Sequence, residues 1–137
     1  MRITQEADYG LRVILYLSKL EYGARMDAGT IAEHESMPLR FLLKLLRKLA
    51  AAEIVKSYRG INGGYTLNRQ PGQITLKDVI EAIDGPICVN RCILDPSYCN
   101  AKKGGRCEVH RALQGVQKSL ASELSKVNFE DLKKGKY

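Results

Sequence analysis

The sequence is poor in the residues that acid–base and nucleophilic catalysis need. It has no tryptophan and only two histidines, His34 and His110, among its 137 residues. It contains no Ser/His/Asp arrangement and no glycine-rich phosphate-binding loop. The length is that of one domain with a modest core, which leaves little chain for a deep catalytic cleft. We therefore do not expect an enzyme.

Long apolar runs are absent as well. Stretches such as Val13–Leu17 are far shorter than the roughly 20 residues of a membrane-spanning helix. The first residues, Met1–Asp8, include Glu6 and Asp8 and lack the apolar region of a signal peptide. These features predict a cytoplasmic protein with no membrane partner. In that compartment the four cysteines would be metal ligands or redox groups rather than structural disulfides.

Positive charge is in excess. The chain has 22 lysines and arginines against 15 aspartates and glutamates, a formal net charge of +7. A basic excess on a small domain favours a polyanionic partner, which could be nucleic acid or an anionic membrane surface. Charge alone does not separate the two, because many small basic domains bind neither.

The first half of the chain has the pattern of a winged helix-turn-helix domain. Helices are predicted over about 4–20, 27–35 and 36–52, and a β-hairpin over 54–67. A fourth helix follows, ending near Asp84, and Gly85 terminates it. The helix starts are marked by residues that cap helices well: Thr4, Asp27, Ser36, and Thr75 with Asp78 as a capping box. The fold class is therefore mainly α with a small β-hairpin wing.

The third helix has the composition of a DNA recognition helix. A helical wheel places five leucines on one side and four basic residues on nearly the opposite side. The apolar side is Leu39, Leu42, Leu43, Leu46 and Leu49, and the basic side is Arg40, Lys44, Arg47 and Lys48. Because the leucines dock the helix on its domain, the basic side would face solvent and could enter a major groove. The alternative is an ordinary solvated face.

The turn of the hairpin adds a second basic element. Arg59 stands beside glycines that permit close backbone approach, and an arginine there suits a minor groove or a phosphate. The glycines also serve ordinary hairpin turn chemistry. The candidate DNA-binding residues are Arg2, Pro38, Leu39, Arg40, Lys44, Arg47, Lys48, Arg59, Gly60, Asn62, Gly63, Gly64 and Tyr65.

A long amphipathic helix is predicted over 108–127. Its apolar residues recur every three or four positions, as in a coiled-coil seam: Leu113, Val116, Leu120, Leu124 and Val127. Little core remains to cover them, so we expect a homodimer, which would read a pseudo-palindromic operator in double-stranded DNA. The alternative is packing on its own domain. We divide the chain into a winged domain (1–84), a cysteine loop (85–107), a dimerisation helix (108–127) and a basic tail (128–137), of which we expect residues 133–137 to be frayed.

All four cysteines lie in the loop before this helix. Cys92 and Cys99 are separated by six residues, Cys99 and Cys107 by seven, and Cys107 and His110 by two. Structural zinc sites usually show paired short spacings such as C-x2-C, and this loop has no C-x2-C pair. Wide spacing with Gly104 and Gly105 suits an adjustable loop around something larger than one ion. An iron–sulfur cluster, zinc and free redox thiols all remain open from spacing.

The N-terminal residues Met1–Arg12, the helix start Pro38–Leu42, the wing Arg59–Tyr65 and the cysteine loop together resemble the Rrf-type bacterial regulators. That family includes IscR, NsrR, RirA and CymR. The resemblance covers nearly the whole chain and implies a homodimeric DNA-binding regulator with an iron–sulfur cluster, used for redox or nitric oxide sensing; we expect repression.

The resemblance implies that Cys92, Cys99 and Cys107 are the cluster ligands. The fourth would be His110, as in IscR-like members with a 2Fe–2S cluster, or Asp8 from the partner, as in NsrR-like members with a 4Fe–4S cluster. The loop spacings are longer than in IscR-like members, and Leu43 replaces their recognition-helix glutamate. Cys88 has no assigned role. The rivals are a cluster-free, thiol- or partner-regulated member such as CymR, and a small Fe–S or thiol redox protein.

Overall fold

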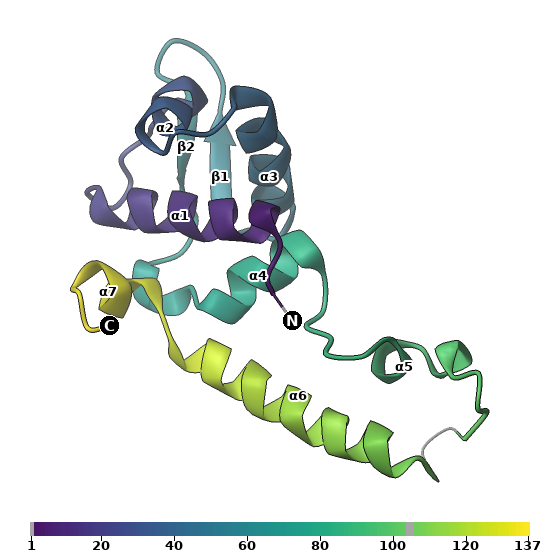
Figure 1. Ribbon diagram of the computed structural model, residues 1–137. Helices are drawn as coiled ribbons and strands as arrows, with labels where there is room; N and C mark the ends of the chain where they lie inside the picture. Colours follow the sequence, from purple (N-terminus) through teal and green to yellow (C-terminus); the bar gives the residue numbers. More distant parts are fainter. Residues whose placement is uncertain (1, 104–105) are drawn as a thin grey trace.

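A computed structural model describes residues 2–103 and 106–137 (Figure 1). Met1, from the N-terminal motif, and Gly104 and Gly105, from the cysteine loop, lie outside the described residues. The elements are α1 (Gln5–Lys19), α2 (Ala28–His34), α3 (Leu39–Ala51), β1 (Val55–Tyr58), β2 (Gly64–Leu67), η1 (Pro71–Gln73), α4 (Leu76–Asp84), α5 (Arg91–Leu94), η2 (Pro96–Tyr98), α6 (Glu108–Lys126) and α7 (Phe129–Lys133). The mainly helical fold with a two-stranded antiparallel hairpin is confirmed.

Three of the predicted caps are present. The Thr4 hydroxyl accepts from the Ala7 N–H at 3.0 Å. The Asp27 carboxylate accepts from the Thr30 N–H at 2.9 Å, and hydrogen bonds from Thr30 lower the pKa of that carboxyl. Thr75 and Asp78 form the expected reciprocal capping box at the start of α4. Local side-chain chemistry thus fixes where these helices begin.

The prediction that Ser36 caps the third helix is wrong. Ser36 has a φ of 53°, and its N–H donates to the Glu33 carbonyl at 3.3 Å. This left-handed turn ends α2 rather than starting α3, because it satisfies a carbonyl left open at the end of α2. The α3 helix begins two residues later than predicted, after Pro38, whose side chain offers no capping acceptor.

The buried side of α3 is rotated from the predicted one. Leu42, Leu45, Leu46 and Leu49 are fully buried. Leu45 lies at the margin of the predicted apolar side on the helical wheel, and its interpretation as a core residue is confirmed, whereas Leu39 is 46% exposed. The side of a helix that docks depends on its neighbours, here α1, α2 and α4, which a wheel drawn from one sequence does not include.

The α6 helix contacts α4 of the winged domain and then extends away from it. In Figure 1, α1 to α4, the hairpin and α7 form one body, and α5 and α6 extend away from it. Close packing of α1 on α4 depends on Gly10, since a Cβ there would collide with the Ile83 side chain. No helix in the described residues is both long and apolar enough to span a membrane.

The prediction of fraying over residues 133–137 is wrong for most of that stretch, because Lys133 ends α7 and the N–H groups of Lys134 and Lys136 donate to the Glu130 and Asp131 carbonyls at 3.2 Å. Residues 129–133 form α7, and the Asn128 side chain caps it by accepting from the Asp131 N–H at 2.9 Å. The Phe129 ring is fully buried in the main core. Backbone hydrogen bonds join the segment to the chain before α4: Phe129 N–H donates to Ile74 O at 3.1 Å, and Leu76 N–H to Val127 O at 3.0 Å. The tail therefore completes the winged domain.

Candidate functional site

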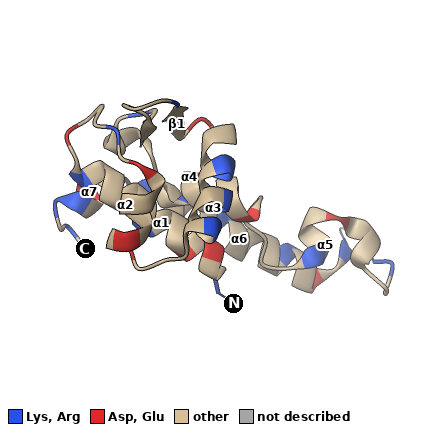
Figure 2. Cartoon of the chain, turned by 90° about the horizontal axis from the view of Figure 1, so that it is seen from above, with Lys and Arg blue, Asp and Glu red and all other residues tan. Residues whose placement is uncertain are grey.

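The basic side of α3 faces solvent over most of its length. Arg40, Lys44 and Arg47 are exposed, as the wheel predicts, and Figure 2 shows blue residues along this helix. Pro38 and Leu39 are exposed at its N-terminal end. Because the leucines on the other side hold the helix in the core, these side chains stand on a rigid platform. The arrangement could place a helix N-terminus and three cations in a DNA groove.

Lys48 is the exception on this side. Its ammonium donates to the Ile83 carbonyl of α4 at 3.2 Å and lies 3.0 Å from Glu6 Oε1 of α1. The Glu6 side chain is only 16% exposed. The expectation that the whole basic side faces solvent is therefore wrong for Lys48, whose charge is directed back into the domain.

We expect Lys48→Met to lower the free energy of unfolding by about 1 kcal/mol. Removal of the half-exposed ammonium would leave the mostly buried Glu6 carboxylate without its Lys48 partner. Urea unfolding measures this, and Glu6→Gln combined with Lys48→Met should recover most of the loss. Arg47→Met, at an exposed position on the same side of α3, is the matched control and should leave stability unchanged. If Lys48→Met instead lowers the slope of log K for DNA binding against log salt by about 0.9, Lys48 contacts a phosphate of the DNA.

The wing is a short antiparallel hairpin with an exposed tip. Val55 pairs with Leu67 and Tyr58 with Gly64. Arg59, Gly60 and Asn62 at the tip are exposed.

Gly63, Gly64 and Tyr65, the remaining candidate DNA-binding residues of the wing, have structural roles. Gly64 has a φ of +140°, and a Cβ there would lie 2.8 Å from the Met26 backbone. A Cβ on Gly63 would collide with the Tyr58 carbonyl oxygen. Tyr65 is half-buried and packs against the core. These three residues shape the wing, and its tip remains exposed.

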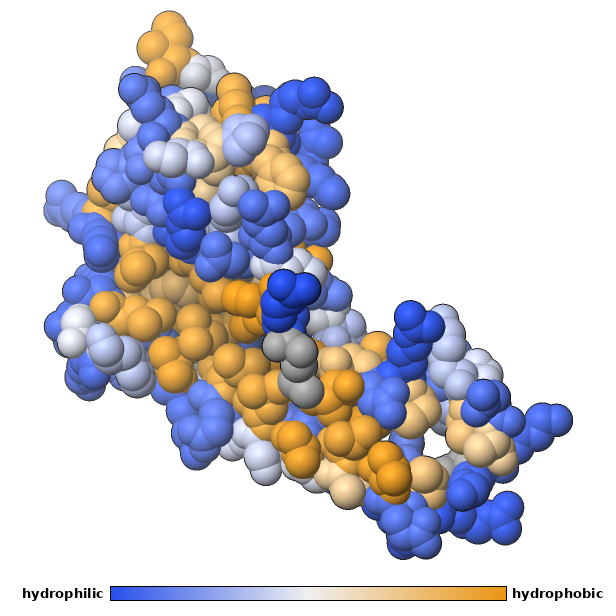
Figure 3. Space-filling model, viewed as in Figure 1, coloured by the Kyte–Doolittle hydropathy of each residue, from blue (hydrophilic) through white to orange (hydrophobic). Residues whose placement is uncertain are grey.

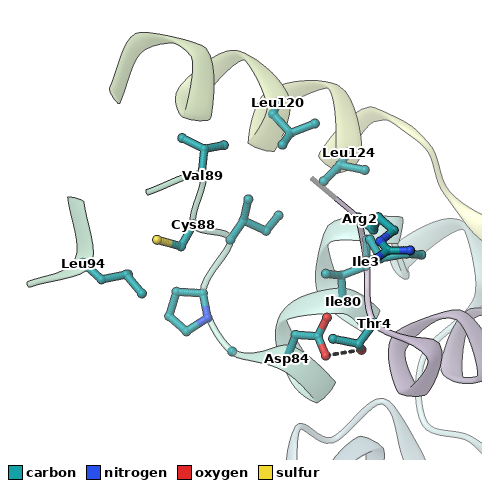
Figure 4. A pocket seen from close by; sticks show the side chains of 13 residues that line it. Arg2, Ile3, Thr4, Ile80, Asp84, Cys88, Val89, Leu94, Leu120 and Leu124 are labelled. Carbon is teal, nitrogen blue, oxygen red and sulfur yellow. Dashed lines mark hydrogen bonds between the residues drawn. The ribbon is translucent and has the colours of Figure 1, made fainter. Parts of the chain in front are cut away.

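Arg2, the N-terminal candidate, is exposed. It lines a cavity of about 500 Å³ between the end of α4, residues 85–89 and α6 (Figure 4). Thr4 donates a hydrogen bond of 2.6 Å to Asp84 in the same wall. Cys88 also lines this cavity, and its thiol donates to the Asn90 carbonyl at 2.9 Å. Cys88 therefore lies on a different cavity from the other three cysteines.

Those three cysteines share one cavity with His110. Cys92 lies on α5, Cys99 follows η2, and Cys107 and His110 lie at the start of α6. All four line a cavity of about 290 Å³ together with Ile93, Pro96 and Gln114. The Cys92 sulfur is 3.3 Å from His110 Nδ1. Segments up to 18 residues apart in sequence thus present three thiols and one imidazole to a common space.

This donor set fits an iron–sulfur cluster. Thiolates and imidazole are the protein ligands of such clusters, and a volume of about 290 Å³ is far larger than one ion needs. Among residues 2–103 and 106–137, no three His, Cys, Asp or Glu side chains are close enough to hold a single metal ion. Asp8 lies exposed on α1 and is not part of the cavity lining within one chain.

Comparisons with known proteins identify the family. The model of the Rrf2 family, described as an iron-dependent transcriptional regulator, matches residues 3–135. The chain belongs to the Rrf2 family. It is a transcriptional regulator with a DNA-binding winged helix and is not an enzyme.

Individual Rrf2 relatives are similar over most of the chain. A protein of Mycobacterium tuberculosis named as an HTH-type transcriptional regulator is 31% identical over 90% of this chain and 77% of its own length. IscR of Xenorhabdus nematophila is 28% identical over 98% of this chain and 80% of its own length. The structure of CymR, the global cysteine regulator of B. subtilis, has a TM-score of 0.70 at 29% identity, covering 98% of this chain and 97% of CymR.

Proposed function

We propose that this Rrf2 regulator is a cytoplasmic homodimer whose affinity for a pseudo-palindromic operator depends on an iron–sulfur cluster. Cys92, Cys99 and Cys107 would hold the cluster, with His110 as the fourth ligand. The observation that carries the proposal is the shared cavity of these four side chains, with the Cys92 sulfur 3.3 Å from the His110 ring nitrogen. A bound cluster would supply redox-active iron that oxidants or nitric oxide can modify.

The proposed ligands lie on segments that connect the cavity to the proposed DNA-binding surface. Cys107 and His110 lie at the start of α6, and the segment before α5 leaves directly from the end of α4. The α4 helix in turn receives the Lys48 hydrogen bond from α3 at Ile83. Ordering of the loop by its ligands would therefore fix α6 relative to the recognition helix, and loop disorder would release it.

The α6 helix supports the homodimer. None of its 19 residues is buried, although it carries Leu113, Val116, Leu120 and Leu124. Val116 is 54% exposed and Val109 64%. Figure 3 shows apolar residues gathered along α6 and where it meets α4. A second copy would cover this surface and set the spacing between two recognition helices, which is what reading two half-sites requires.

At each half-site, the contacts we propose come from two elements. The exposed Arg40, Lys44 and Arg47 of α3 would lie in the major groove and on its phosphates. Arg59 at the wing tip would reach the adjacent minor groove or backbone.

The experiment is anaerobic purification followed by UV-visible and Mössbauer spectroscopy with iron and sulfide assays. We expect iron in the wild type and its loss, to below a tenth, in Cys92→Ala, because one of only three thiolates is removed. Cys88→Ala is the matched control and should retain iron, since Cys88 lines the other cavity. His110→Ala should change the spectrum, and Asp8→Ala should not.

Each alternative has its own result. A spectrum altered by Asp8→Ala and unaltered by His110→Ala would assign the fourth ligand to Asp8 of the partner. Iron-free protein in every anaerobic preparation would contradict the cluster proposal. It would support a second candidate, thiol or partner regulation, which the 29% identity to the cysteine regulator CymR favours.

A further inference from the structure

One arginine outside the wing holds the wing at two points. Arg25 lies in the segment between α1 and α2. Its guanidinium stands 3.6 Å from the centroid of the Tyr58 ring, at the end of β1. Its Nη1 also donates to the carbonyl of Asn62, in the tip, at 3.3 Å. A single planar side chain thus connects the stem of the hairpin with its tip.

The base of the wing is held separately by backbone contacts. Met26, next to Arg25, forms an isolated antiparallel bridge with Tyr65: Met26 N–H donates to Tyr65 O at 3.0 Å, and Tyr65 N–H to Met26 O at 2.8 Å. Gly64 lets the two backbones approach this closely. We therefore expect removal of the Arg25 side chain to leave the pairing of β1 with β2 unchanged. Any effect of the removal on DNA binding would then come from the tip and not from the strands.

The tip itself has little to hold it. Gly63 N–H donates to Gly60 O at 3.0 Å inside the turn. Arg59, Gly60 and Asn62 are exposed, and Ile61 is fully exposed. A glycine-rich turn of this kind samples many backbone conformations unless something restricts it. The contact of Arg25 with Asn62 supplies such a restriction.

We propose that Arg25 is a positioning residue for DNA recognition, which fixes the wing tip so that Arg59 is presented to the DNA in one orientation. The planar guanidinium is what the role needs, because it stacks on the Tyr58 ring while a nitrogen at its edge donates to Asn62. An ammonium would keep the charge and lose this geometry. The inference rests on the proposed role of the wing in DNA binding, and the test separates the two.

The test uses the full chain and the duplex that the wild type selects best from a random DNA pool. Arg25→Ala should weaken binding to this duplex about tenfold, because the wing tip must then be ordered when DNA binds, which costs binding free energy. Arg25→Lys should be nearly as weak, and Tyr58→Phe, which keeps the ring, should bind like the wild type. The slope of log K against log salt should be unchanged by Arg25→Ala, since no phosphate contact is lost. Thermal unfolding checks that each variant is folded.

A double-mutant cycle with Arg59→Ala completes the test. If Arg25 acts through the tip, adding Arg25→Ala to Arg59→Ala weakens binding less than twofold further. Additive losses with a slope reduced by about 0.9 would overturn the proposal and make Arg25 itself a phosphate contact. Normal binding by Arg25→Ala, with Arg59→Ala impaired, would overturn only the positioning role. Normal binding by Arg59→Ala would overturn the proposed role of the wing, and this inference with it.

Discussion

Replacement of Phe129 by alanine should lower the free energy of unfolding by about 3–5 kcal/mol. Its ring is fully buried in the core of the winged domain although it lies only eight residues before Tyr137. Alanine would remove the buried ring and leave a cavity between α1, α7 and the segment before α4. Since domains of this size are stable by about 5–15 kcal/mol, a large fraction of the stability would be lost.

Urea unfolding followed by circular dichroism measures this loss. Phe129→Leu should cost distinctly less, because leucine still fills part of the space. Tyr137→Ala is the matched control: it removes an aromatic ring from the same segment, but one that is 72% exposed, and should change stability by less than about 0.5 kcal/mol. A small effect of Phe129→Ala would mean that the last helix does not belong to the core.

Replacement of both Arg40 and Lys44 by alanine should weaken binding to the selected DNA duplex about a hundredfold. Both side chains are exposed on α3, and neither is buried in the leucine-rich side that holds the helix. Loss of two phosphate contacts would lower the salt slope by about 1.8, whereas loss of one base contact and one phosphate contact would lower it by about 0.9. Fluorescence anisotropy at several salt concentrations measures both quantities.

The control removes the same charge elsewhere. Lys133→Ala with Lys134→Ala also takes away two positive charges, but from the end of α7, on the opposite side of the winged domain from α3 (Figure 1). Its effect should stay within a few-fold. Equal losses in the two double variants would mean that only net charge matters. Unchanged DNA binding in Arg40→Ala/Lys44→Ala would contradict the recognition helix.

Features set by neighbouring residues could be read from the sequence. Thr4, Asp27 and the Thr75–Asp78 capping box were predicted as helix starts and are confirmed, because a cap needs only a side chain and an N–H two or three residues on. The hairpin was predicted for a similar reason, from two apolar segments around a glycine-rich turn.

Features that join distant parts of the chain could not be read in this way. The contact of Lys48 with Glu6 spans α3 and α1, and the burial of Phe129 depends on the segment before α4. Asn128 was a usable signal, since it precedes two acidic residues in the way an N-cap does. The lysines that follow it led instead to a prediction of a frayed tail.

Some residues of the candidate sites could likewise be predicted from the sequence, and others could not. The spacing of Cys92, Cys99, Cys107 and His110 indicated a shared site, and the structure places all four around one cavity. The separate position of Cys88 had no signal in the spacing. Arg25 had none either, because its two partners, Tyr58 and Asn62, lie more than thirty residues further along the chain.

The burial of Phe129 also bears on the order in which a ribosome makes the molecule. Proteins are synthesised from the N-terminus, and domains generally fold as units once their residues have emerged. Here the core of the winged domain receives its last large side chain only after residues 85–107 and α6 have been made. A nascent chain therefore presents its four cysteines before the core of the winged domain is complete.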